Sequence, residues 1–191
     1  WQIANLINAD AEEISFTSGA TEAINLAIKG LADQERKHII TIQTEHKAVL
    51  ETCFYMENIG FKISYLPVGQ DGLLDINLLN ETITDKTLVF IGMFSNNETG
   101  VIHPIEDIGK IAKQSDVFFV CDGTQGVGKL PIDVVSSNID ILCFSGHKLY
   151  APKGIGAIYI DDSIASRVRQ RRLQSQTTIN GESITERVAR R

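Results

Sequence analysis

Short apolar runs that end in polar or turn residues recur along most of the chain. Four precede the middle of the sequence, at Glu12–Ser18, His38–Gln43, Lys62–Leu66 and Thr87–Met93, and three more lie between Val117 and Ile160. Runs of this length bounded by turn residues predict β-strands. Apolar residues at helical spacing lie between these runs and predict helices after Gly19 and over Lys47–Asn58, Ile76–Thr82 and Pro104–Ala112.

This alternation of strands and helices from Glu12 to Ile160 predicts the α/β class. We expect a mainly parallel sheet with helices on both faces, because sequential strands joined by helices run in the same direction. In open sheets of this kind, ligands bind just outside the carboxyl ends of the strands. The residues that follow each apolar run are therefore the candidates for function.

The stretch Val117–Ile160 organises the rest of the chain. Its first apolar run ends in Asp122, and its second ends in Ser145-Gly146-His147-Lys148. Two buried parallel strands would bring this acid and this lysine to one sheet edge. A carboxylate at the mouth of a buried strand needs a partner. Pyridoxal phosphate chemistry requires this pair: an amine that holds the aldehyde as a Schiff base, and a carboxylate for the ring nitrogen.

Three other strand ends have two interpretations each. Ser18-Gly19-Ala20-Thr21 precedes a helix, so it is either an anion site or an ordinary Ser/Thr cap. His46 follows a strand and opens a helix, so it either caps that helix or stacks on a flat cofactor ring. Ser95–Gly100 is either a plain surface loop or part of the same site.

Composition narrows the function classes. The chain has 191 residues, 43% hydrophobic and 22% charged, and a net charge of -6 without a basic stripe, which argues against nucleic-acid binding. No membrane span, signal peptide, metal-ligand spacing, Gly-x-Gly-x-x-Gly motif or Walker motif is visible. The odd set Cys53, Cys121 and Cys143 favours a reducing compartment.

The charge pattern changes sharply near Ile164. Residues 163–191 contain seven Arg, no Lys and only two acids, Glu182 and Glu186. We therefore expect one large domain over residues 1–162 and an arginine-rich tail over residues 163–191. The tail is either a basic binding arm built on Arg167, Arg169, Arg171 and Arg172 or a solvated segment.

Five motifs in register resemble one family of enzymes. They are SGATEAINLAIKG, TEHKAVLETC, NNETG, DGTQGVGKLPID and SGHKLYAPKGIGA. Together they are similar to the cysteine desulfurases of the NifS/IscS type, in the class V aminotransferase branch of pyridoxal-phosphate enzymes. The resemblance runs from about Ile3 to Ile160 and implies the large domain of the three-layer type I fold.

The resemblance implies a role for each matched residue. Lys148 would hold the cofactor and shuttle protons, and His46 would stack on the ring as the second catalytic residue. Asp122 would pair with the ring nitrogen, and Gln125 would bind the phenolic oxygen, near Asn97. The phosphate would be bound by the remaining positions, Ala20, Thr21, Ser145 and His147.

The family reaction converts L-cysteine to L-alanine and leaves the sulfur as a persulfide on a protein cysteine, which supplies iron-sulfur clusters or thio-cofactors. The resemblance also implies a homodimer, a sulfur-acceptor or scaffold protein as partner, and a cytoplasmic location, or the mitochondrial matrix in a eukaryote. Nothing in the motifs implies nucleic acid or a membrane.

The chain departs from the family after Lys148. The family's persulfide cysteine, its Gly-Gly-Gly and Arg-x-Gly-Thr elements, its substrate-clamping arginine and its second domain have no counterpart among residues 161–191. We therefore expect negligible turnover by this chain alone. Two alternatives stay open: a non-catalytic accessory protein that binds partners, and another class V activity such as a selenocysteine lyase or an aminotransferase.

Overall fold

The computed structural model describes residues 1–32, 35–164, 166–168, 178–179 and 182–183. It divides the chain into two compact units, Trp1–Ile160 and Asp161–Arg191. In the second unit, β8 (Thr178–Ile179) pairs antiparallel with β9 (Glu182–Ser183). Three of the four arginines of the expected basic arm, Arg169, Arg171 and Arg172, lie outside the described residues. The interpretation of the two parts as a domain and a tail stays a prediction.

A seven-stranded sheet forms the first unit, in the order β1-β7-β6-β5-β4-β2-β3. Strands β2 to β6 pair parallel with one another, and β7 is antiparallel to both β1 and β6. This confirms the mainly parallel sheet. The strands are β1 (Ile14–Thr17), β2 (His38–Ile42), β3 (Lys62–Leu66), β4 (Thr87–Met93), β5 (Phe118–Asp122), β6 (Ile141–Ser145) and β7 (Gly156–Ile160).

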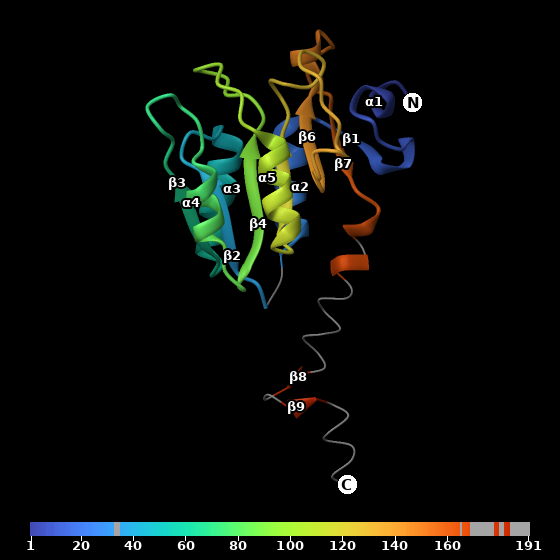
Figure 1. Cartoon of the computed structure of the whole chain (residues 1–191). Helices are drawn as coiled ribbons and strands as arrows, with labels where there is room; N and C mark the ends of the chain where they lie inside the picture. The colour runs from blue at the N-terminus through green and yellow to red at the C-terminus, as the bar shows by residue number, and fades with distance from the viewer. Residues whose placement is uncertain (33–34, 165, 169–177, 180–181, 184–191) are drawn as a thin grey trace. The chain divides into compact units, whose positions relative to one another are not determined.

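Helices cover both faces of the sheet, which confirms the three-layer arrangement. Figure 1 shows α4 and α5 on one face and α2 and α3 on the other. The helices are α1 (Gln2–Ile7), α2 (Ala20–Gly30), α3 (Lys47–Asn58), α4 (Ile76–Thr82) and α5 (Ile105–Gln114), with short 3₁₀ turns at Ala11–Glu13 and Gly146–Leu149. Helix α1 was not predicted from the sequence pattern.

Two local features differ from the simplest interpretation of the sequence, and each has a physical cause. The third apolar run of the central stretch forms β7, which is antiparallel in an otherwise mainly parallel sheet. The link from Ser145 to Gly156 is too short for the helical crossover that parallel strands need. The first strand begins at Ile14 rather than Glu12, because a 3₁₀ turn precedes it, in which the Glu13 side chain accepts from the Asp10 amide at 2.9 Å.

Elsewhere the expected ends were close. Helices α3 and α4 have the predicted bounds. Helix α3 ends before Gly60, whose φ of 94° is the left-handed conformation expected of a glycine cap. Helix α5 begins one residue after the predicted Pro104, which serves as its N-cap, and continues to Gln114.

The core of the first unit lies around the central strands. Every residue of β2, β4, β5 and β6 is buried, because layers of helices cover both faces. Such strands place polar chemistry mostly at their ends. The carboxyl ends of these four strands lead to His46, Ser95, Asp122 and Lys148. The fold therefore gathers the candidate residues at one edge of the sheet.

None of the helices in the described part of the chain combines the length and the apolar character that a membrane span requires.

Candidate functional site

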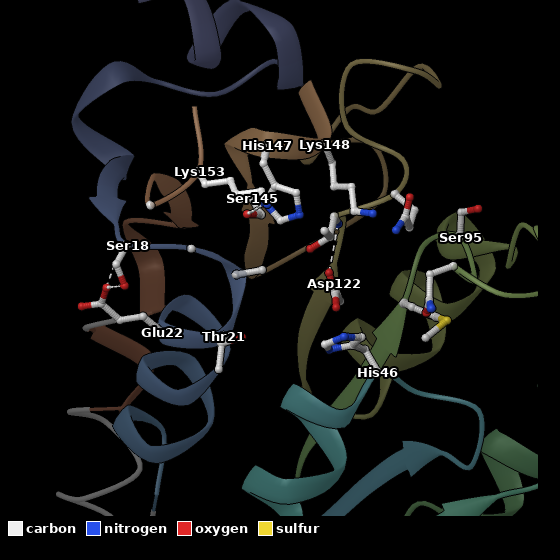
Figure 2. A pocket seen from close by; sticks show the side chains of 17 residues that line it. Ser18, Thr21, Glu22, His46, Ser95, Asp122, Ser145, His147, Lys148 and Lys153 are labelled. Atoms are coloured by element: carbon white, nitrogen blue, oxygen red, sulfur yellow. Dashed lines mark hydrogen bonds between the residues drawn. The ribbon is translucent and has the colours of Figure 1, made fainter. Parts of the chain in front are cut away.

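A cavity of about 550 Å³ opens at the carboxyl edge of the sheet. Figure 2 shows side chains from several elements around it, among them Lys148, Asp122 and His46. All nine residues singled out from the sequence line this cavity: Ala20, Thr21, His46, Asn97, Asp122, Gln125, Ser145, His147 and Lys148. The structure thus brings together residues that are up to 128 positions apart in the sequence. Their individual roles stay predictions.

Asp122 is the last residue of β5 and lies at the cavity wall with only 6% of its surface exposed. Its Oδ1 accepts a hydrogen bond from the Thr124 amide at 2.9 Å. Burial raises the pKa of Asp122, and the hydrogen bonds from Thr124 offset part of that shift. Within the described residues, no lysine or arginine forms an ion pair with this carboxyl group. A bound cation would therefore find a buried carboxylate that lacks a charged partner.

The lysine side of the cavity is a 3₁₀ turn directly after β6. This turn, Gly146–Leu149, carries His147 and Lys148. Ser145, the last residue of β6, shares a hydrogen bond of 2.7 Å between its Oγ and His147 Nδ1. In Figure 2 the Lys148 side chain extends into the cavity above Asp122. Because β5 and β6 pair parallel, Asp122 and the turn that carries Lys148 lie at the same edge of the sheet, as the sequence pattern predicted.

His46 is the N-cap of α3, and its Nδ1 accepts a hydrogen bond from the Ala48 amide at 3.1 Å. The sequence left capping and ring stacking as alternatives. The structure shows the cap, and it also places the side chain on the cavity, so the capping bond fixes the ring where a flat ligand would lie.

Glu45 is a buried carboxyl group that the sequence analysis did not single out. It is 6% exposed, and its Oε1 accepts from the Met93 amide at 2.6 Å. Its Oε2 has no hydrogen-bond partner among the described residues. Burial, and next the nearby charge of Asp122, raise the pKa of Glu45 well above its ordinary value. This residue joins the end of β2 to the end of β4 behind the cavity wall.

Asn96 builds the loop that presents Asn97. Its side chain donates to the Thr44 carbonyl at 3.0 Å and accepts from the amides of Glu98 and Thr99 at 2.8 and 2.9 Å. Asn96 is buried, whereas Asn97 is exposed and lines the cavity. The polar loop after β4 is therefore a supported part of the site rather than a plain surface loop.

The start of α2 packs directly against β7. A Cβ atom on Gly156 would lie 2.6 Å from the Cα atom of Gly19, so no other residue fits at this contact. The contact holds the first turn of α2, with Ala20 and Thr21, beside the cavity. Free amides at a helix N-terminus attract anions. This geometry favours the anion-site interpretation of the sequence over the simple cap, since no side chain caps α2.

Glu22 places a negative charge beside that helix start. Its Oε2 accepts from the amide and the hydroxyl of Ser18 at 2.6 and 2.7 Å. The Ser18 amide, and next the Ser18 hydroxyl, lower the pKa of Glu22. Figure 2 shows this pair at the edge of the cavity.

The sequence analysis gave no individual role to the other lining residues: Ser18, Gly19, Glu22, Met93, Ser95, Thr124, Lys153 and Gly154. Most belong to the motifs already noted, adjacent to a predicted residue. Lys153 is the clearest omission, because a second lysine in the turn after Lys148 was a visible signal.

All three cysteines are buried away from the cavity lining. Burial is the main cause that raises the pKa of Cys53 to about 12 and the pKa values of Cys121 and Cys143 well above their ordinary value. Because the thiolate is the nucleophilic form, these thiols are unsuited to attack a sulfur or carbon centre.

The cavity combines the amine of Lys148, the buried carboxylate of Asp122, the imidazole ring of His46 and the N-terminus of α2, which can bind an anion. These groups suit a ligand that carries an aldehyde, a cationic flat ring and a phosphate. In the described part of the chain, no group of three or more His, Cys, Asp or Glu residues is arranged to hold a metal ion.

Comparison with known proteins points in the same direction. The model of the aminotransferase class-V family matches residues 1–188. The cysteine desulfurase IscS of Ehrlichia chaffeensis is 52% identical over 183 residues, which is 94% of this chain and 43% of the relative. The mitochondrial cysteine desulfurase of Drosophila melanogaster is 52% identical over 162 residues, 83% of this chain and 35% of the relative.

Solved structures of similar proteins share the fold. A structure of SspA in complex with cysteine superposes with a TM-score of 0.83 and 46% identity, covering 86% of this chain and 48% of that one. A NifS-like protein superposes with a TM-score of 0.83 and 36% identity, covering 85% of this chain and 46% of that one. The chain thus spans less than half the length of each of these relatives.

One expectation from the motifs was wrong. They placed the end of the resemblance near Ile160, whereas the family match continues to residue 188. The arginine-rich segment is therefore part of the similarity, although it carries none of the motifs that the sequence analysis sought.

Proposed function

Because this chain belongs to the class-V aminotransferase family, we propose that it is the large-domain portion of a pyridoxal-phosphate-dependent cysteine desulfurase. Its substrate would be L-cysteine, and its products L-alanine and protein-bound sulfur. The observation that supports this most is the convergence of all nine residues named in the sequence analysis on one cavity. The cysteine desulfurases among the relatives, at 52% identity, support the same activity over the alternatives.

The residues of the cavity fit the cofactor. Lys148 Nζ is the amine that the aldehyde requires, and Asp122 is a buried carboxylate without a charged partner, as a ring nitrogen requires. His46 would lie against the ring face, and Gln125 and Asn97 would reach the phenolic oxygen. Thr21, Ser145 and His147, with the Ala20 amide, would bind the phosphate. When bound, pyridoxal phosphate withdraws electrons from an amino-acid substrate and makes its bonds labile.

The protein groups would direct that chemistry. Asp122 would keep a proton on the ring nitrogen, because an ion pair favours the charged form of both partners. Lys148 Nζ would take and return the proton at the substrate Cα. His46 is held by its capping bond to Ala48 and would fix the orientation of the ring. Asp122 is the last residue of β5, Lys148 lies in the 3₁₀ turn directly after β6, and His46 is the N-cap of α3. These fixed positions would keep the three groups preorganised.

The sulfur-accepting thiol would come from outside these 191 residues. The chain has three cysteines, and all are buried with raised pKa values. A complete enzyme would therefore combine this cavity with a thiol on another segment or chain. We propose a homodimer and a sulfur-acceptor or scaffold protein as partners. We also propose a cytoplasmic or mitochondrial-matrix location, which agrees with the bacterial and mitochondrial relatives.

Titration with pyridoxal phosphate, followed by visible absorbance, tests the proposal. We expect a saturable new band for the wild-type chain and for Lys110→Ala, a matched control because Lys110 lies on α5 and pairs with Asp107. Lys148→Ala should lack the band. If the wild-type chain gives no band, or if Lys148→Ala gives the same one, the proposal is wrong for this chain.

A further inference from the structure

We propose that Lys153 is a phosphate-binding residue of the cavity and supplies the positive charge that its anion site needs. The inference rests on the proposed function for the identity of the ligand, but its charge argument concerns any phosphate. Lys153 lines the same cavity as Thr21, Ser145 and His147. In Figure 2 its side chain points toward Ser145 and His147.

The backbone places Lys153 beside the start of α2. Gly154 follows it with a φ of 84°, a left-handed turn that sends the chain back into β7. Gly156, two residues later, makes the close contact with Gly19. Lys153 therefore sits next to the point at which β7 meets the N-terminal turn of α2.

The charges that line the cavity leave the anion site short of a cation. Two acids and two lysines line it: Glu22, Asp122, Lys148 and Lys153. Lys148 would be committed to the aldehyde, and a phosphate carries up to two negative charges. Glu22, at the same helix start, adds repulsion. Among the cavity residues, Lys153 is the remaining lysine, and no described residue forms an ion pair with it.

The other donors at this end either share a hydrogen bond already or carry only partial charge. Ser145 and His147 already share a hydrogen bond with each other. The amides of α2 carry only partial charges. A lysine ammonium carries a full charge and three donors, and charge-assisted hydrogen bonds to phosphate are about twice as strong as neutral ones. Lys153 would thus contribute affinity specifically for the phosphate part of a ligand.

Inorganic phosphate is the first probe, because it does not depend on the aldehyde chemistry. Thermal unfolding is followed with added sodium phosphate against sodium chloride of equal ionic strength, since a ligand that binds the folded state raises the midpoint. We expect phosphate to stabilise the wild type, Lys153→Arg and the control Lys110→Met. Lys153→Met should lose most of that increase. An equal increase in Lys153→Met, or none in the wild type, would overturn the inference.

A second comparison uses pyridoxal phosphate against pyridoxal, which lacks the phosphate. Lys153→Met should weaken pyridoxal phosphate binding by about 10- to 100-fold, the size of one charged hydrogen bond, and leave pyridoxal binding unchanged. Equal loss for both molecules would mean a general distortion of the cavity and would contradict the inference. If the wild type binds neither molecule, the proposed function fails, while the phosphate measurement still decides the role of Lys153.

Discussion

Strands β5 and β6 carry two kinds of chemistry within a few residues of each other. In their interiors lie Cys121 and Cys143, fully buried thiols whose pKa values are raised mainly by burial. At their carboxyl ends lie Asp122 and, after β6, Lys148, which line the cavity. Asp122 even pairs in register with Cys143 across the sheet. Access to the cavity thus separates the available groups from the inert ones.

The comparison teaches that residue type alone does not mark reactivity in this chain. In water, a cysteine side chain is a better nucleophile than an aspartate side chain. In this chain, burial disfavours the thiolate, which is the reactive form of cysteine. Asp122, at the end of its strand, is also buried, but it faces the cavity. A cationic ligand bound there can therefore offset the energetic cost of burying its charge. We therefore propose that this chain builds a cofactor pocket at the sheet edge and holds no sulfur-accepting thiol of its own.

The largest expected effect concerns the thiols. With a pKa of about 12 instead of 9.0, the thiolate fraction of Cys53 near pH 8 is about 1000-fold lower than that of a free thiol. We expect a thiol-specific chromogenic reagent to label the native chain slowly and the chain in denaturant rapidly at three positions. Fast labelling of the native chain would show that the buried thiols are reactive and would contradict this account of the cysteines.

The same contrast predicts the catalytic behaviour of the isolated chain. With pyridoxal phosphate and L-cysteine, we expect negligible release of alanine, because no exposed thiol takes up the sulfur. Amino-acid analysis of the reaction mixture measures this, with Lys148→Ala as the blank. Robust alanine release that requires Lys148 would show that a thiol of this chain does act, and the account of the cysteines would be wrong.

A third prediction concerns Asp122 at the end of β5, where one substitution should lower cofactor affinity and raise the stability of the cofactor-free chain. Asp122→Asn keeps the shape of the side chain but removes its charge, so affinity for pyridoxal phosphate should fall by about 100-fold, as for other broken buried ion pairs. The cofactor-free chain should become more stable near pH 7, because burial raises the pKa of Asp122 and thus opposes its ionised form. Absorbance titration and urea unfolding measure the two effects.

A matched change on the surface, Asp85→Asn, should alter neither property, because Asp85 is exposed. If Asp122→Asn binds the cofactor as well as the wild type does, then Asp122 does not pair with the ring nitrogen. If it lowers stability, the interactions of the carboxylate in the cofactor-free chain, such as the hydrogen bond from the Thr124 amide, outweigh the cost of its burial, and the expected sign is wrong.

The smallest expected effect concerns Glu45, behind the cavity wall. Its carboxyl group would ionise near 4.5 in the unfolded chain and at higher pH in the folded chain, since burial raises its pKa. Between these values the folded chain binds more protons than the unfolded one, so stability falls as the pH rises. The slope is at most about 1.4 kcal/mol per pH unit for one proton.

Glu45→Gln retains an oxygen for the Met93 amide and removes the titration. We expect its unfolding free energy to depend less on pH above 4.5 than that of the wild type, as measured by urea unfolding at several pH values. Glu57→Gln, an exposed change on α3, should keep the wild-type slope. An unchanged slope in Glu45→Gln would show that this carboxyl group ionises normally.

Much of the fold could be predicted from the sequence, for reasons visible in particular elements. Strand β4 and helix α3 have the expected bounds, because a fully buried strand is a continuous apolar run and α3 is closed by Gly60. The direction of β7 could not be predicted from its own residues, since a buried strand has the same composition in either direction. Helix α1 has only six residues and gave no clear periodicity.

Some residues of the candidate site could also be predicted from the sequence, and others could not. Asp122 and Lys148 were found because a polar residue directly after an apolar run is conspicuous. Glu45 was missed because its importance depends on a contact with a distant segment, the Met93 amide. Lys153 was visible as a second lysine after Lys148, but its position near the start of α2 was not. Periodicity reports position along a strand, but it does not report such contacts between distant segments.

The most direct test of the central claim is to locate the bound cofactor chemically. The chain is incubated with pyridoxal phosphate, reduced with borohydride, digested and analysed by mass spectrometry, with L-cysteine omitted. The account predicts one modified peptide, with the cofactor mass on Lys148, and its loss in Lys148→Ala. Modification spread over surface lysines such as Lys47 and Lys86, with Lys148 unmodified, would show that the sheet edge of this chain does not form the pocket.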